Sequence, residues 1–140
     1  MNMRTGSIAI FGCTADPFTI AHRAIVEEII NQNIADQVVI VPTMVSWHRK
    51  GKQRWLNDDE RVKVIEEMMK CSTIGYNKWT LDSGEISAYY SFDDDASRAA
   101  WLRRRRFIDK LITMKNYYRG YKLKVVIGHD EFSIFKQWAE

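Results

Sequence analysis

Residues 11–22 of the chain read FGCTADPFTIAH and separate two apolar segments near the amino terminus. The segment before them, residues 7–11, is apolar and uncharged, which predicts a buried strand. The segment after them, residues 20–34, has apolar side chains at helical spacing and predicts an amphipathic helix. The apolar face of that helix is expected to consist of Ala21, Ile25, Val26, Ile29 and Ile30. Residues 11–22 are therefore expected to turn the chain from a strand into a helix.

A second strand is predicted at residues 37–41, QVVIV, which Pro42 is expected to stop. A strand, a helix and a strand within about 35 residues fit the βαβ unit of a parallel sheet, whose connection is almost always right-handed. Further on, Asn57 precedes Glu60 by three residues, a spacing typical of a capping box. A helix is therefore expected to begin at Asn57, and its apolar stripe ends near Cys71.

The second half of the chain gives weaker patterns. Trp79–Leu81 is a strand candidate, and the three acidic residues at 93–95 suit the amino terminus of a helix. Residues 96–118 carry apolar side chains at helical spacing, residues 123–127 (LKVVI) predict a strand, and residues 130–138 predict a short helix. The element order predicts an α/β fold, a doubly wound parallel sheet with helices on both faces.

The composition is that of an ordinary globular protein. The 140 residues are expected to form one domain spanning 1–140, with 46% apolar and 28% charged residues. Neither a run of about 20 apolar residues nor a signal-peptide pattern occurs, so we expect no membrane association and a cytoplasmic location. The net charge of +3 tolerates an anionic ligand but does not favour a nucleic-acid partner. The sequence is compatible with a homo-oligomer.

The cysteines and histidines exclude some kinds of site. Cys13 and Cys71 are the only cysteines and form no CxxC pair, and the three histidines are scattered. A disulfide framework and a structural zinc site are therefore not expected. We expect no protein-held metal site, and any metal to be Mg²⁺ that enters with a nucleotide.

The predicted junction at 11–22 has the chemistry of a phosphate site. Gly12 and Gly128 each follow a predicted strand, where a missing Cβ lets a ligand approach the backbone. The helix that follows Gly12 offers unpaired N–H groups and a positive dipole end to an anion. Thr19 and His22 at its start are able to donate hydrogen bonds to phosphate oxygens. The alternative is a plain turn with a threonine cap and a partly buried histidine.

The motif Gly-x-x-x-Asp-Pro-x-Thr-x-x-His after a first strand resembles the nucleotidyltransferase signature, written G-x-F-D-P-x-[HT]-x-G-H. The matching positions are Gly12, Asp16, Pro17, Thr19 and His22. Two positions depart from the signature: Ala15 replaces the phenylalanine, and Ala21 replaces the glycine before the histidine. Alanine is small enough to keep the close packing that the glycine permits.

Three later segments resemble bacterial nicotinate mononucleotide adenylyltransferases. Pro42 followed by residues 47–50, WHRK, is similar to their P…PHK loop, and residues 57–61 are similar to their S-x-E-x-R helix. In that family the glycine of I-G-x-D stands ten residues before a tryptophan, and Gly128 and Trp138 keep this spacing. The family's S-Y-T substrate loop is matched loosely by Ala88, Tyr89, Tyr90 and Ser91.

The resemblance implies a Rossmann-like fold and the transfer of AMP from ATP to nicotinate or nicotinamide mononucleotide, with Mg²⁺ bound to ATP. It implies that His22, Thr19 and Lys50 are catalytic. It implies that ATP is bound by Gly12, Cys13, Thr14, Asp16, Thr19, His22, Gly128 and Asp130. It implies that the phosphorylated acceptor is bound by His48, Lys50, Arg61, Tyr90 and Trp138, with Trp138 stacked on the pyridine ring.

Two other functions stay open. Thr19 in place of a histidine is also the choice of pantetheine-phosphate adenylyltransferases, which share the fold. The 140 residues lack the family's I-S-S-T-x-I-R segment, which favours a non-catalytic nucleotide-binding module. The run Arg103–Arg106 does not replace that segment, because successive helical positions point about 100° apart. We interpret it as a solvated helix face.

Overall fold

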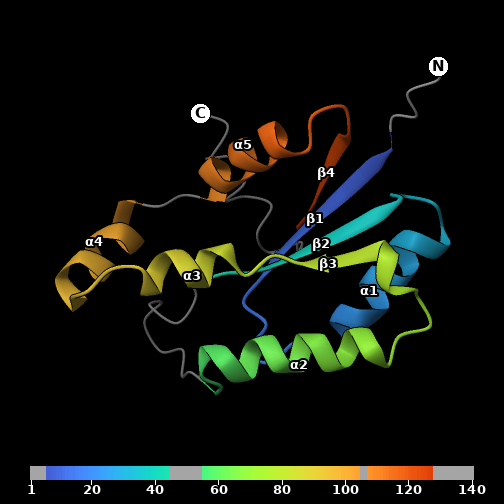
Figure 1. Cartoon of the computed structure of the whole chain (residues 1–140). Coiled ribbons are helices and arrows are strands. Elements are labelled where there is room, and N and C mark those ends of the chain that lie inside the picture. Colours follow the sequence, from blue (N-terminus) through green and yellow to red (C-terminus); the bar gives the residue numbers. More distant parts are fainter. Residues whose placement is uncertain (1–5, 45–54, 105–106, 128–140) are drawn as a thin grey trace.

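A four-stranded parallel sheet forms the centre of the molecule, with strand order β3-β2-β1-β4 (Figure 1). The computed structural model describes residues 6–44, 55–104 and 107–127. The elements in chain order are β1 (Ser7–Cys13), α1 (Ile20–Asn31), β2 (Gln37–Pro42), α2 (Asp58–Lys70), the 3₁₀ turn η2 (Tyr76–Lys78), β3 (Trp79–Leu81), α3 (Gly84–Tyr90), α4 (Asp95–Arg104), α5 (Phe107–Tyr117) and β4 (Lys122–Val126). The predicted α/β fold is confirmed.

Strands β1 and β2 are buried on both faces because each carries apolar side chains at every central position. Alternate residues of β1 enter opposite cores: Ala9 and Phe11 pack with residues of α1 and α2. Ile8 and Ile10 pack instead with Met114 of α5. Since side chains alternate along a strand, two helical layers are needed to cover the sheet. The result is the predicted arrangement of helices on both faces.

Helix α1 begins where the sequence predicted but ends earlier. The structure ends it at Asn31, not at Ile34, because Asn33 takes a positive φ of 55° and the Ile34 amide turns back to the Ile29 carbonyl. Its buried face is centred on Val26 and Ile29. The expected core position of Ile25 is wrong: its side chain is 41% exposed, since it lies at the margin of that face.

Helix α2 follows its predicted capping box closely. Asn57 is the N-cap, its side-chain oxygen accepts from the Glu60 amide at 2.8 Å, and the Glu60 carboxylate accepts from the Asn57 amide at 3.2 Å. Cys71 is the C-cap. Ile65 and Met69 of the predicted stripe are buried against the sheet.

The later elements differ in detail from the sequence patterns. Strand β3 is confirmed, whereas α3 was not predicted. The apolar pattern of residues 96–118 belongs to two helices, α4 and α5, and Asp94 caps α4 by accepting from the Ser97 amide at 2.7 Å. Strand β2 includes Pro42 instead of stopping before it, and β4 begins one residue earlier than predicted. The predicted helix at 130–138 lies outside the described residues.

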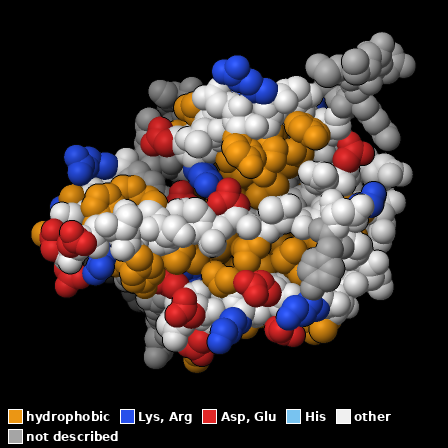
Figure 2. All heavy atoms as spheres, in the orientation of Figure 1, with side chains coloured by type: hydrophobic (Ala, Val, Ile, Leu, Met, Phe, Trp, Pro, Cys, Tyr) orange, Lys and Arg blue, Asp and Glu red, His pale blue; other side chains and the backbone are white. Residues whose placement is uncertain are grey.

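The sheet has a topological switch point beside β1. Helices α1 and α2 cover one face on the β2–β3 side, and α5 covers the other face (Figure 1). In open parallel sheets, ligands bind in the crevice outside the carboxyl ends of the strands at such a point. The end of β1 and the turn that follows it therefore lie where a ligand site is expected. Figure 2 shows hydrophobic side chains on both sides of the β3 segment, under α5 and above α2.

Candidate functional site

The carboxyl end of β1 is packed against the start of α5. A Cβ added at Gly12 would lie 2.5 Å from Cζ of Phe107, so only glycine leaves room for this ring. In the structure, the space that a Cβ of Gly12 would occupy holds the Phe107 ring, and the expectation that Gly12 admits a ligand stays a prediction. Cys13, the last residue of β1, is a partly buried free thiol, and its carbonyl accepts from the Thr43 amide at 2.9 Å.

Thr19 and His22 form a reciprocal cap at the amino terminus of α1. The Thr19 hydroxyl accepts from the His22 amide at 3.4 Å, and Nδ1 of His22 accepts from the Thr19 amide at 2.8 Å. The hydroxyl also lies 2.9 Å from Nδ1. The threonine cap of the alternative interpretation is thus present, and the histidine side chain takes the place that glutamate takes in an ordinary capping box.

The cap also defines which nitrogen of His22 carries the proton. A backbone N–H can only donate, so Nδ1 must be the acceptor and the neutral ring carries its hydrogen on Nε2. Burial lowers the pKa of His22 below its usual value of 6.5. The ring stacks on Phe18 with centroids 5.0 Å apart and lies 5.9 Å from the Phe11 centroid. His22 is therefore a fixed, neutral hydrogen-bond donor through Nε2 at pH 7.

Asp16 connects the turn to a distant part of the chain. Its carboxylate accepts from the backbone amides of Trp55 at 3.0 Å and Leu56 at 2.7 Å, just before α2. Sequence reasoning placed Asp16 among the ATP ligands. In the structure its carboxylate instead fixes the chain entering α2 beside the β1–α1 turn.

Arg61 was predicted to bind the acceptor, but the structure buries its side chain to 1% exposure. Its Nε and one terminal nitrogen donate to the Thr14 carbonyl, and the same terminal nitrogen donates to the Thr43 carbonyl. The other terminal nitrogen donates to Asp58 at 2.8 Å and contacts the sulfur of Met44 at 3.7 Å. Every N–H of the guanidinium thus has a protein partner, so its role here is to hold the turn.

Tyr90, also predicted as an acceptor ligand, lies at the end of α3. Its hydroxyl donates to the Asp58 carboxylate, and its ring lies 5.7 Å from the Arg98 guanidinium of α4. Asp58 is 4% exposed and accepts from both Tyr90 and Arg61. Tyr90 is therefore joined to the β1–α1 turn through two buried side chains.

Six of the predicted residues lie at the junction of β1 and α1, between the end of the strand and the first turn of the helix. They are Gly12, Cys13, Thr14, Asp16, Thr19 and His22. The predicted His48, Lys50, Gly128, Asp130 and Trp138 lie outside the described residues. Arg103 and Arg104 are exposed in the last turn of α4, as expected of a solvated face.

Sequence reasoning missed Asp58 and Phe107. Asp58 and Arg61 are three residues apart on one helix, a spacing that places their side chains as neighbours, so the pair could have been predicted. Nothing in the sequence pairs Phe107 with Gly12, because that contact depends on how α5 crosses the sheet.

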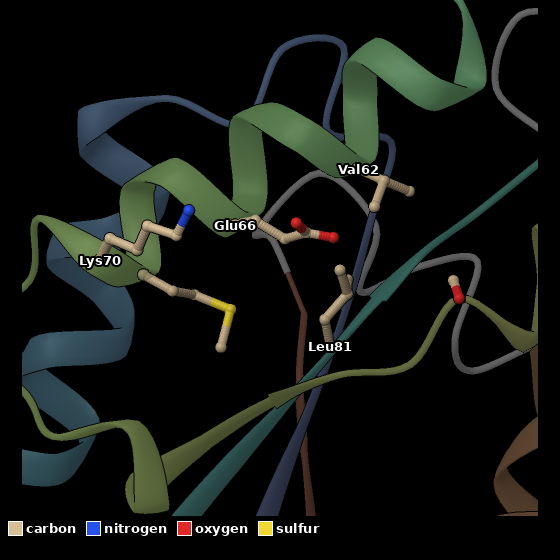
Figure 3. A pocket seen from close by; sticks show the side chains of 6 residues that line it. Val62, Glu66, Lys70 and Leu81 are labelled. Carbon is tan, nitrogen blue, oxygen red and sulfur yellow. The ribbon is translucent and has the colours of Figure 1, made fainter.

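A separate hollow of about 420 Å³ lies between α2 and the edge strand β3. In Figure 3, Val62, Glu66 and Lys70 project from α2 beside Leu81 of β3. None of the described candidate residues lines it, and its mouth carries charges of both signs. Across the described ranges, no group of three His, Cys, Asp or Glu side chains gathers as a metal site.

The comparisons with known proteins agree with this geometry. The cytidylyltransferase-like family model matches residues 10–140. The chain belongs to the cytidylyltransferase-like family. It is 24% identical over 132 residues to a protein of Aliarcobacter butzleri named "Probable nicotinate-nucleotide adenylyltransferase", covering 94% of this chain and 62% of that protein. A protein of Borrelia garinii subsp. bavariensis with the same name is 26% identical over 136 residues, covering 95% of this chain and 58% of that protein.

The structural likeness concerns the fold. A Plasmodium falciparum nicotinic acid mononucleotide adenylyltransferase complexed with NaAD matches with a TM-score of 0.66 at 20% identity, covering 92% of this chain and 55% of that one. The chain thus spans about three fifths of the length of the relatives it matches. Among the described helices, none has the length and apolar character needed to cross a membrane.

Proposed function

We propose that this chain is an adenylyltransferase domain that transfers AMP from ATP to a pyridine mononucleotide and releases pyrophosphate. One observation carries the proposal. At the carboxyl end of the central strand, the start of α1 presents a neutral His22 whose Nδ1 is committed to the cap and whose Nε2–H remains to donate. A helix amino terminus with such a donor suits a phosphate group. The names of the relatives favour nicotinate mononucleotide as the acceptor.

The reaction needs no protein nucleophile. An oxygen of the acceptor's 5′-phosphate attacks the α-phosphorus of ATP, a new P–O bond forms, and the bond from the α-phosphorus to the oxygen bridging to the β-phosphate breaks. The electron pair leaves with pyrophosphate. Catalysis is then positioning and stabilisation of charge on the phosphates. In this proposal His22 donates from Nε2 to a phosphate oxygen, and Thr19 holds the ring in the tautomer that makes this possible.

Charge neutralisation needs cations beyond a neutral histidine. We assign this role to His48 and Lys50, and to magnesium bound to ATP. Trp138 is assigned to the pyridine ring, and Gly128 and Asp130 to the adenosine side. Arg61 and Asp16 are assigned to holding the turn in shape, in agreement with their observed bonds.

The test offers purified protein magnesium ATP with nicotinate mononucleotide, nicotinamide mononucleotide or 4′-phosphopantetheine. Pyrophosphate release is followed by a coupled assay, and the product is identified by mass spectrometry. We expect a dinucleotide from a pyridine mononucleotide. Product only from 4′-phosphopantetheine would move the chain to the pantetheine-phosphate branch. Binding of ATP by calorimetry without product from any acceptor would make it a nucleotide-binding module.

A further inference from the structure

Tyr90 of α3 begins a chain of side-chain contacts that ends at the predicted phosphate turn. Its hydroxyl donates to one carboxylate oxygen of Asp58, and Arg61 donates to the other at 2.8 Å. Asp58 and Arg61 are 4% and 1% exposed, so the bond between them is shielded from water, whereas the Tyr90 side chain is half exposed. A carboxylate held on both sides has one orientation, and it presents a fixed partner to the guanidinium.

Arg61 connects Asp58 to the backbone at the ends of two strands. It donates to the carbonyls of Thr14 and Thr43, which directly follow β1 and β2. These two segments are also joined by the Thr43 amide, which donates to the Cys13 carbonyl at 2.9 Å. The guanidinium therefore links the backbone segments that directly follow β1 and β2, next to Gly12 and Cys13.

The other side of Tyr90 is held by α4. The Arg98 guanidinium lies 5.7 Å from the Tyr90 ring centroid and 5.8 Å from that of Tyr89, a cation–π arrangement. Figure 1 shows α3 and α4 side by side at the flank of the sheet, away from α1. The position of the α3–α4 pair is thus linked to the turn by named contacts across four segments of the chain.

We propose that Tyr90 is a positioning residue for the phosphate turn, acting through Asp58 and Arg61, and not a ligand of the acceptor. When the hydroxyl is removed, the buried Asp58 loses the hydrogen bond from Tyr90, its carboxylate is held less rigidly, and Arg61 holds the two carbonyls less firmly. Displacements well below 1 Å at a phosphate site are enough to weaken binding and catalysis. The binding part of this inference rests on the proposed function, whereas the structural part does not.

The test compares Tyr90→Phe with Tyr117→Phe, a tyrosine on α5 that is 79% exposed. Phenylalanine keeps the ring under Arg98, so the fold is retained, which circular dichroism checks. Amide exchange measured by NMR follows the Thr43 N–H, whose bond to Cys13 reports on the junction. Calorimetry measures the affinities for magnesium ATP and for nicotinate mononucleotide separately.

We expect about tenfold faster Thr43 exchange and a several-fold weaker affinity for magnesium ATP in Tyr90→Phe, with no change in Tyr117→Phe. The acceptor affinity should stay within about twofold. Unchanged Thr43 exchange would overturn the link, and faster exchange with unchanged ATP affinity would overturn the positioning role. A loss confined to the acceptor would make Tyr90 a direct ligand. If the wild-type chain binds no ATP, the proposed function fails, and Thr43 exchange still decides whether the link exists.

Discussion

Two polar arrangements meet at the β1–α1 turn, and they are built on different scales. The Thr19–His22 cap closes within a single helical turn, from residues three positions apart. The Arg61 cluster joins residues from the ends of β1 and β2 with α2 and α3. The first presents a donor to a ligand, whereas the second has all its donors inside the protein. The β1–α1 turn thus combines a local cap that presents a hydrogen-bond donor with a long-range cluster that fixes the backbone.

The difference has an energetic consequence. A cap is partly exposed and contributes about 1 kcal/mol, while a buried ion pair that loses one partner costs several. Changes in the Arg61 cluster should therefore act first on stability, and changes in the cap first on activity. The following substitutions test this division, from the largest expected effect to the smallest.

Replacing Arg61 by methionine should lower the free energy of unfolding by about 3–5 kcal/mol, because the buried Asp58 carboxylate loses its ion pair. Urea denaturation at pH 7 measures this change. The matched control is Lys70→Met on the same helix, which breaks the exposed pair with Glu67 and should cost no more than about 1 kcal/mol. An equal loss of unfolding free energy in the two variants would mean that the buried Arg61 stabilises the fold no more than the exposed Lys70.

Replacing His22 by alanine should reduce kcat by about 10²–10³-fold, the usual effect of removing one donor to a developing charge. The free energy of unfolding should fall by about 1–2 kcal/mol, since the cap and the contact of the ring with Phe18 are lost. Steady-state kinetics and urea denaturation measure both quantities. Asn31→Ala, at the far end of α1, is the control and should change neither. Activity of the His22 variant at the wild-type level would refute its assigned role.

Gly12→Ala should cost about 1–3 kcal/mol of stability, because the new Cβ meets the Phe107 ring. Phe107→Leu in the same chain should recover most of that loss, as expected for two residues in direct contact. The double-mutant cycle is measured by urea denaturation. If the cost of Gly12→Ala is the same with leucine at 107, the ring is not the obstacle.

Thr19→Ala should cost about 1 kcal/mol, whereas Thr19→Ser keeps the hydroxyl and should cost only a few tenths. In Thr19→Ala the backbone N–H still reaches Nδ1 of His22, so the Nε2–H tautomer should persist. NMR of the imidazole nitrogens reads the tautomer directly. A shift of the proton to Nδ1 would show that the hydroxyl, and not the amide, selects the tautomer.

The smallest effect is a pH dependence of stability. Burial lowers the pKa of His22, so below about pH 6.5 the unfolded chain takes up a proton that the folded chain resists. This contribution is absent above pH 7 and destabilises the fold as the pH falls through 6.5 and below. In His22→Gln, the free energy of unfolding should depend less steeply on pH between pH 8 and pH 5.5. An unchanged slope would assign the pH dependence to other groups.

The same contrast of scale explains what the sequence could predict. The cap of α2 could be predicted, since Asn57 contacts Glu60 only three positions away. At α1 the sequence offered a threonine cap as the alternative, but not the bond that His22 returns to it. The βαβ unit was readable because its apolar runs are continuous. Helix α3 was not, because it has only seven residues and a mixed pattern that begins at a glycine.

Sequence reasoning named residues of the candidate site without their protein partners. It predicted Asp16 and Arg61 as ligands, and in the structure both side chains also bond to distant backbone groups. Their partners, the amides of Trp55 and Leu56 and the carbonyls of Thr14 and Thr43, are backbone groups, which carry no signal in a sequence. A charged residue near a phosphate motif can therefore bind the ligand or hold the protein backbone, and its burial distinguishes these two roles.

The position of β1 in the sheet also governs when the site can exist during synthesis. One flank of β1 pairs with β2 soon after it, from Ile8 beside Gln37, but the other flank waits for β4, with Ser7 beside Lys122. Until β4 leaves the ribosome, the apolar strand β1 has an unpaired edge open to other nascent chains. Such late, non-local pairing slows folding, so the strand that leads into the candidate site gains its second partner only late in synthesis.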